Sequence, residues 1–571
     1  MTDTVRDSIY EAIASIRLID PHTHINPHAP ASNTLADLLG YHYYTELAHS
    51  AGMPKDQIEE DGLSHRELVR RLVTNLSPLA NTAQYRWLIE ICRKFFGFTG
   101  ERLDESNWEE VFETSETQMK LADWPQMVLD QSNVEAVFLT NDFDDELEGF
   151  DSDTYIPCLR TDDLVFHLSK SETRERLTAC TGIELNGSLA NLRESLRQRF
   201  EHFVGRGARA CAISLPPDFS PTRISDGRAT TALNDVLLHG IMADPAHQTA
   251  LSRSVFWTLA ELCDEYGLPF DLMIGVNRGV YPEGVYQGQD LYDSRVSLIQ
   301  YRELFNSFPQ VKFPISVLAS VTNQELVSYA WIFPNVITNG HWWYSNTPSF
   351  IARDATARLE AVPQTKQIAY YSDAYKLEFV WPKFDMYRQI LSGILTDHFV
   401  KGNGWSEERA IELGRQILRS NVDEIFPRPR PLTENNAERA STESVNNDSI
   451  TSEENPAVIS IISDDELDPL PSHDEIQSAN AGDVQLFDDS VEHRHPTTDG
   501  LASEIDPEPL DVGDLLGTDS EPSTNPDIRM LRGEDSFEVD EESLLLQPDP
   551  TTGELKFPPS SSDEEATSSD D

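Results

Sequence analysis

Short apolar runs alternate with longer amphipathic stretches through the first 430 residues of the chain. This alternation is typical of parallel strands joined by helical crossovers. Eight apolar runs follow the pattern, at residues 17–24, 134–141, 155–162, 208–215, 269–276, 311–318, 335–340 and 367–373. Helices are expected between them, at residues 227–241, 246–266, 294–307, 322–332, 348–361 and 377–397. Eight strand-then-helix units predict an α/β fold, a closed (β/α)8 barrel of the TIM type, with an open doubly wound sheet as the alternative.

More than 100 residues separate the first predicted strand from the second. Within them, residues 31–52 and 64–98 place apolar side chains at helical spacing. We therefore expect a helical insertion at about residues 30–130. It should lie over the face of the barrel where the strands end and where active sites of this fold are built.

Acidic residues are concentrated at the C-terminal end. Residues 431–571 hold 38 Asp or Glu against five Lys or Arg, and their only aromatic residues are three phenylalanines. Such a segment buries too little apolar surface to offset the entropy of the chain. The sequence predicts a barrel domain at 1–430 and a disordered acidic tail at 431–571, whose partner is unknown.

Charge and cysteine content narrow the function classes. The formal net charge of −54 disfavours binding to nucleic acid or to an anionic membrane surface. The five cysteines are odd in number and lack CxxC spacing, and neither a secretion signal nor a membrane span is evident. We expect a cytoplasmic protein, with a homo-oligomer left open.

Candidate metal ligands lie at the two ends of the strand series. His22 and His24 end the first strand, where alternation puts both side chains on one face. Asp373 ends the eighth strand, which closes against the first in a barrel. The three side chains could bind one divalent ion. The alternatives are cap or surface histidines, and an N-cap role for Asp373 in the helix that starts near Leu377.

These residues resemble the amidohydrolase superfamily and, more narrowly, the uronate (glucuronate) isomerase family. Tyr41-His42-Tyr43 looks like the family's YHY motif, and residues 339–346 resemble its double-Trp segment. Residues 159–162 resemble its RPD-containing strand, and residues 288–294 a degenerate form of its GPDxGFDS loop. The resemblance covers residues 17–425 and excludes the tail.

The chain departs from the family pattern at two positions. Tyr375 stands where the family usually has Arg, two residues beyond the strand-eight Asp, and Met273 replaces the His of a fifth-strand LHIG. The missing Lys or Glu at the end of residues 208–215 argues against a bridged two-metal site, so one ion is expected. Zinc is the ion we expect, although His2Asp suits several divalent metals.

The resemblance implies interconversion of an aldose uronate, such as glucuronate or galacturonate, and its ketose. That reaction needs an acid/base to move a proton between adjacent carbons, for which Asp373, His42 and Tyr43 are the candidates. It also needs an electrophile, which a divalent ion supplies. His42 and Tyr43 have an alternative as core or cap residues of a helix.

Substrate-binding candidates follow from the carboxylate and the sugar ring. A guanidinium pairs with a carboxylate through two hydrogen bonds, so Arg160 is the first choice and Arg278 the second. Arg160 could instead be an ion-pair partner of Asp162 or Asp163. Trp342 and Trp343 could close a wall of the pocket, or serve only in packing.

Two other functions compete with the isomerase. A mononuclear metal-dependent hydrolase or decarboxylase of the same superfamily is favoured by the missing Arg and His, and would act on small amides or carboxylic acids but not on uronates. A barrel that no longer catalyses would serve as a scaffold, would bind no metal and would depend on its tail.

Overall fold

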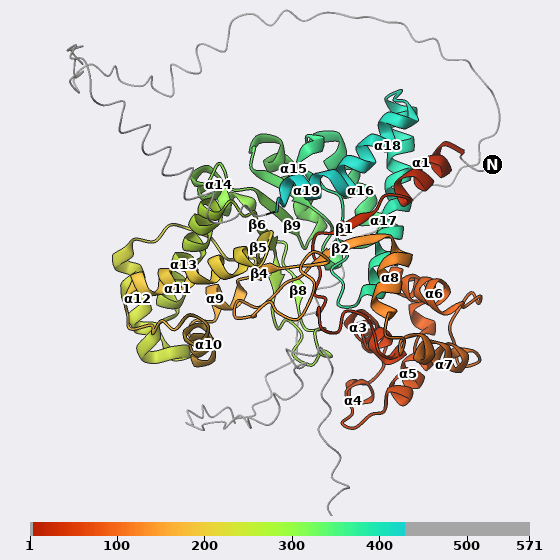
Figure 1. The fold of residues 1–571 in the computed structure, drawn as a ribbon, viewed down its shortest axis with the longest axis horizontal. Helices are drawn as coiled ribbons and strands as arrows, with labels where there is room; N and C mark the ends of the chain where they lie inside the picture. Colours follow the sequence, from red (N-terminus) through yellow and green to blue (C-terminus); the bar gives the residue numbers. More distant parts are fainter. Residues whose placement is uncertain (1–3, 429–571) are drawn as a thin grey trace, which may run out of the picture. The chain divides into compact units, whose positions relative to one another are not determined.

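The computed structural model describes residues 4–428. The predicted tail at 431–571 lies outside them. Within the described part, parallel strands follow one another in chain order around a barrel (Figure 1). They are β1 (Leu18–Asp20), β2 (Val134–Phe138), β3 (Tyr155–Ile156), β4 (Cys158–Arg160), β5 (Ala210–Leu215), β6 (Phe270–Ile274), β9 (Phe313–Val317), β10 (Val336–Asn339) and β11 (Gln367–Ile368). Each predicted apolar run contains at least one of these strands.

Pro157 divides the third strand position of the barrel into two short strands, β3 and β4. The β3 half pairs with β2 and the β4 half pairs with β5, and a proline cannot donate a ladder hydrogen bond between them. The ring closes beyond the ends of β11 and β1, where the Asp373 amide donates to His22 O at 3.1 Å and the His24 amide to Ala374 O at 2.8 Å. The barrel prediction is confirmed, and the open-sheet alternative is wrong.

The two ends of the barrel differ. Small and branched side chains such as Ile19, Ala136 and Ile337 fill the interior. Val422 and Ile425 from α19 (Asn421–Ile425) and Phe426, directly after it, pack against them. Two residues that precede strands bind this segment: Arg209 Nε donates to Phe426 O at 2.6 Å, and Lys312 Nζ donates to Glu424 O. This segment therefore closes the barrel at the amino ends of the strands, so a substrate-binding site must lie at their carboxyl ends.

Helices cover the outside of the barrel at the predicted places, although the helix expected from residue 294 begins at Arg302, and further helices lie at residues 162–205, where none was specified. They are α9 (Asp162–Phe166), α10 (Ser171–Thr181), α11 (Leu189–Gly205), α12 (Asp226–His239), α13 (Pro245–Tyr266), α14 (Arg302–Ser307), α15 (Asn323–Ile332), α16 (Pro348–Ala361) and α17 (Val380–Ile394). The predicted helix at 377–397 is irregular, since a 3-10 turn precedes α17 and a π-helical segment, Leu395–Gly402, follows it. Helix α1 (Thr4–Ala14) packs on α17 and α18 (Glu407–Arg415). A two-stranded hairpin, β7 (Val276–Asn277) with β8 (Leu291–Tyr292), follows β6.

The expected insertion is helical and packs beside α17 (Figure 1, red to orange). Its helices are α2 (Leu35–Leu39), α3 (His42–Ser50), α4 (Lys55–Ile58), α5 (His65–Thr74), α6 (Ala83–Phe96), α7 (Trp108–Gln118) and α8 (Trp124–Ser132). A buried carboxylate joins it to the barrel: Glu378 accepts from Trp124 Nε1 at 2.8 Å and from the Ser32 amide at 2.9 Å. Among the described residues, no helix has both the length and the apolar composition needed to cross a bilayer.

The turn after β10 depends on a glycine. Gly340 has φ +46°, and a Cβ placed there would overlap the ring of Tyr371. We expect Gly340→Ala to lower the free energy of unfolding by about 2–4 kcal/mol. The methyl group would overlap the buried Tyr371 ring, and alanine disfavours the left-handed backbone conformation at this position. Gly97→Ala is the matched control, since Gly97 has φ +68° with open space around it, and should cost about 1 kcal/mol. If urea unfolding shows the same loss of free energy of unfolding for Gly340→Ala and Gly97→Ala, the overlap with Tyr371 is contradicted.

Candidate active site

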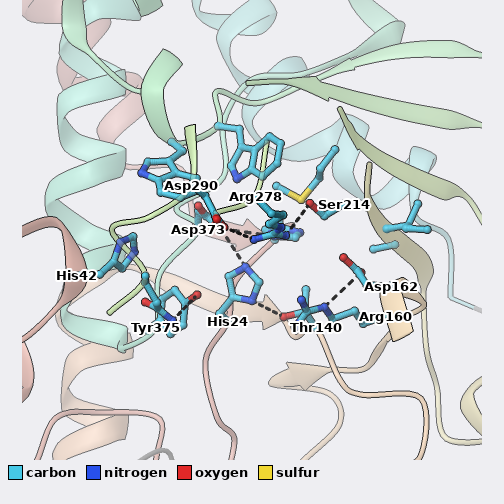
Figure 2. Close-up of a pocket in the computed structure, with 17 residues that line it drawn as sticks. His24, His42, Thr140, Arg160, Asp162, Ser214, Arg278, Asp290, Asp373 and Tyr375 are labelled. Carbon is cyan, nitrogen blue, oxygen red and sulfur yellow. Dashed lines mark hydrogen bonds and ion pairs between the residues drawn. The ribbon is translucent and has the colours of Figure 1, made fainter. Parts of the chain in front are cut away.

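A cavity of about 240 Å³ opens at the carboxyl ends of the strands. Figure 2 shows side chains from different strands and from α3 converging on it. It is lined by His22, His24, His42, Thr140, Arg160, Asp162, Ala212, Ile213, Ser214, Met273, Arg278, Gln287, Asp290, Trp342, Trp343, Asp373 and Tyr375. Most of the residues singled out in the sequence therefore surround one cavity.

His22, His24 and Asp373 form a cluster of metal-ligand type. One potential ligand atom from each lies within 4.8 Å of the others. His24 Nε2 is 3.3 Å and His22 Nε2 is 3.6 Å from Asp373 Oδ1. Within residues 4–428, His22 Nε2 and Asp373 Oδ1 are buried without a well-formed hydrogen bond. Two nitrogens and one carboxylate oxygen turned toward the same point fit a divalent ion.

The electrostatics of the cluster suit metal binding. Burial lowers the pKa of His22 to about 3, so its imidazole is neutral at pH 7. Burial raises the pKa of Asp373, but the adjacent His24 and the charge of Lys383 outweigh it and hold that pKa below its usual value. Neutral imidazole and ionised carboxylate are the states that bind metals.

Neighbouring side chains orient the two histidines. Thr140 Oγ1 lies 2.8 Å from His24 Nδ1, and the ring of Tyr375 stacks on His24 with centroids 4.9 Å apart. Behind His22, Asp271 Oδ2 is 3.9 Å from Nδ1, and Asp271 Oδ1 accepts from Asn339 Nδ2 at 3.0 Å. Burial raises the pKa of Asp271 to about 7, and the hydrogen bond from Asn339 opposes that rise. Such outer contacts fix ring orientation in metal sites.

The structure separates the two candidates at the start of α3. His42 lines the cavity, and its Nδ1 lies 2.7 Å from Glu46 Oε1. Tyr43 is buried but is not among the lining residues; its ring packs near Trp87 and Lys383. Adjacent helical residues point about 100° apart, so both cannot face the cavity equally. This placement of Tyr43 favours its alternative as a packing residue.

Both candidate arginines line the cavity and both are ion-paired. Arg160 Nε lies 3.3 Å from Asp162 Oδ2, as the ion-pair alternative also expects, whereas Asp163 pairs with Arg176 instead. Arg278 Nη1 lies 2.7 Å from Asp290 Oδ2, and its side chain is 56% exposed. The Arg160 side chain is 39% exposed, so it is the less exposed of the two cations.

The two tryptophans form part of the cavity wall. Trp342 is buried, and the ring of Trp343 stacks on Tyr344 with centroids 4.9 Å apart. Met273 and Tyr375, the two departures from the family pattern, line the same cavity. Asp373 caps no helix, since the 3-10 turn at Leu377 starts from Lys376 without a side-chain cap.

Three polar residues near the site were not singled out from the sequence. Asp271 interrupts the apolar run of β6. Because burial of a carboxylate is costly, an Asp inside an apolar strand indicates a polar partner or a functional role. Thr140 follows β2 at the same end of the barrel. Lys383 lies inside α17, where nothing in the sequence distinguishes it from an exposed lysine.

Comparison with known proteins decides the family. The family model for glucuronate isomerase matches residues 1–426. The chain belongs to this family. A uronate isomerase from Thermotoga neapolitana is 22% identical over 428 residues, which cover 70% of this chain and 93% of that protein.

Solved structures of glucuronate isomerase family members have the same fold. The crystal structure of uronate isomerase from Thermotoga maritima is 19% identical with a TM-score of 0.68, covering 75% of this chain and 98% of the other. Glucuronate isomerase from Caulobacter crescentus gives 19% identity and a TM-score of 0.68, covering 75% and 95%. The likeness extends over almost the full length of both relatives.

Proposed function

We propose that this glucuronate isomerase family member interconverts a hexuronate aldose, of the glucuronate type, and its ketose at a single divalent metal site. The observation that carries the proposal is the convergence of His22, His24 and Asp373 in a cavity whose lining also includes the Arg160 guanidinium. Family membership and the names of the similar proteins support the same reaction. The substrate is therefore a small molecule.

The proposed metal ligands are His22, His24 and Asp373, with zinc as the proposed ion. When bound, such an ion polarises the substrate's oxygens and stabilises negative charge that develops on them. Nitrogen and carboxylate ligands in this number are common for zinc, although they also suit manganese and other ions.

Proton transfer is assigned to side chains beside the cluster. Isomerisation removes a proton from one carbon and returns one to its neighbour, so a base must reach both. Asp373 and His42 both face the cavity, and the Glu46 contact at His42 Nδ1 leaves Nε2 for proton transfer. Tyr43 stays a candidate only if its buried hydroxyl reaches the substrate.

The substrate carboxylate is assigned to Arg160, with Arg278 in support. Arg160 is held by Asp162 at the end of β4 on the cavity wall, and Arg278 reaches Ser214 Oγ at 3.3 Å. Trp342 and Trp343 would face the sugar ring and exclude water. The neutral Tyr375 and Met273 leave these two arginines as the cations of the cavity lining.

Metal removal is the first test of the metal site. We expect a strong chelator such as dipicolinate to abolish conversion of glucuronate or galacturonate by the full chain, and one equivalent of Zn²⁺ to restore it. Titration with Mn²⁺ and Co²⁺ on the same sample identifies the preferred ion. Full turnover by protein shown to be metal-free would contradict the proposal.

The competing functions give different results in that experiment. A bound metal with turnover of small amides or carboxylic acids, and no reaction of uronates, would select the hydrolase or decarboxylase alternative. A chain that takes up no metal would select the scaffold. The cytoplasmic location, the boundary near residue 430 and a homo-oligomer stay predictions; the location is supported by five cysteines that are all free thiols.

A further inference from the structure

A buried lysine lies directly behind the turn that carries Asp373. Lys383 on α17 has no exposed surface, and its Nζ donates to Ser372 O at 2.8 Å. Its Nζ also lies 3.4 Å from the hydroxyl of Tyr41, which itself donates to Asp373 O at 3.1 Å. Neither Lys383 nor Tyr41 is among the residues that line the cavity. Both therefore act on the backbone of the turn and not on a substrate.

Aromatic rings hold the ammonium group in place. Lys383 Nζ lies 5.3 Å from the ring centroid of Tyr41, 4.9 Å from that of Tyr43 and 5.0 Å from that of Trp87. All three rings belong to the helical insertion, whereas Lys383 belongs to the helix after the last strand. Cation–π attraction offsets part of the cost of burying the charge. The insertion thus contacts the Lys383 ammonium group through three aromatic rings.

The turn needs such support because its backbone is strained. Asp373 has φ +54°, in the left-handed region that costs a residue other than glycine about 1–3 kcal/mol. Asp20 Oδ1 accepts from the Ser372 amide at 3.0 Å, and His22 O accepts from the Asp373 amide at 3.1 Å. The first strand and the segment directly after it therefore bind both amides of the turn, and Lys383 and Tyr41 bind both carbonyls.

We propose that Lys383 and Tyr41 are positioning residues that hold the Ser372-Asp373 turn so that the Asp373 carboxylate meets His22 and His24. The helical insertion thereby completes the metal site without supplying a ligand. The proposal rests on the metal site of the proposed function, but it does not depend on which sugar reacts.

Metal affinity measures this role directly. In Lys383→Met and Tyr41→Phe, competition with a chromogenic chelator should show affinity for Zn²⁺ or Co²⁺ lower by about 10- to 100-fold, as for other residues that orient ligands. The melting temperature of the metal-free Lys383→Met protein should fall only modestly, because the substitution leaves Ser372 O without its hydrogen bond but also removes a buried charge. With saturating metal, kcat should fall more than KM changes. The double variant should lose little more than the worse single variant, since both act on one turn.

Two control variants remove the same kinds of bond elsewhere. Tyr44, on the same helix as His42, donates its hydroxyl to Gln84 O, and Lys366 donates Nζ to Ala330 O and Phe333 O. Tyr44→Phe and Lys366→Met should leave metal affinity unchanged. The proposal is overturned if affinity in Lys383→Met and Tyr41→Phe falls no further than in these controls. If Lys383→Met does not fold, Tyr41→Phe decides, because it removes one oxygen atom.

The outcomes separate this proposal from the proposed function. A protein that binds metal but converts no hexuronate refutes the isomerase, while the affinity series still decides the roles of Lys383 and Tyr41. If the unmutated protein converts hexuronates and metal affinity is unchanged in Lys383→Met and Tyr41→Phe, only the positioning roles are refuted. An unmutated protein that binds no metal refutes both.

Discussion

Asp373→Asn is expected to lower turnover of a hexuronate by about 10³- to 10⁴-fold. The substitution keeps the size of the side chain but removes the charge that faces His22 and His24. It takes away one metal ligand of the proposed site and, at the same time, one of the two candidate bases that face the cavity. Turnover is measured as ketose formed from glucuronate with Zn²⁺ in excess.

A matched carboxylate distinguishes this loss from damage to the fold. Asp385 is also a buried carboxylate, but it binds Gln389 Nε2 and Tyr10 and does not line the cavity. Asp385→Asn should change stability and leave the rate within about threefold of the unmutated protein. An Asp373→Asn variant with normal turnover would remove Asp373 from both proposed roles.

Arg160→Met should lower kcat/KM for a hexuronate by about 10²-fold, because it removes charge-assisted hydrogen bonds to a carboxylate in a partly enclosed site. Arg160→Lys should recover only part of the loss, since an ammonium cannot pair through two parallel hydrogen bonds. The metal content should stay at one equivalent, because Arg160 is not a ligand. Steady-state kinetics and elemental analysis on the same sample check both statements.

Arg278→Met is the matched comparison. Arg278 is more exposed than Arg160, so water competes for its hydrogen bonds and a smaller loss, about tenfold, is expected. A larger loss in Arg278→Met than in Arg160→Met would reverse the assignment of the substrate carboxylate. An unaltered kcat/KM in Arg160→Met would leave Arg160 as the ion-pair partner of Asp162.

The barrel and the clustering of His22, His24 and Asp373 could be predicted from the sequence, for physical reasons that are local. Alternation within one strand directs His22 and His24 to the same side. Closure of a parallel barrel then brings the end of the eighth strand, with Asp373, beside the end of the first. Neither step needs knowledge of distant packing, so these residues could be found without a structure.

Other parts of the site depend on packing that a sequence does not display. Tyr43 follows His42 in the motif, but helix geometry turns it away from the cavity lining. Lys383 looks like a surface residue, and its burial depends on rings more than 280 positions away in the chain, such as Trp87. Asp271 could have been noticed inside its apolar strand, yet its partner Asn339 lies on another strand.

The most direct test of the central claim is conversion of glucuronate by the unmutated full chain, followed by proton NMR together with the metal content of the same sample. The account predicts one equivalent of divalent metal and appearance of the ketose, with both lost in His22→Ala. A chain that carries one equivalent of metal and leaves glucuronate and galacturonate unchanged would contradict the isomerase.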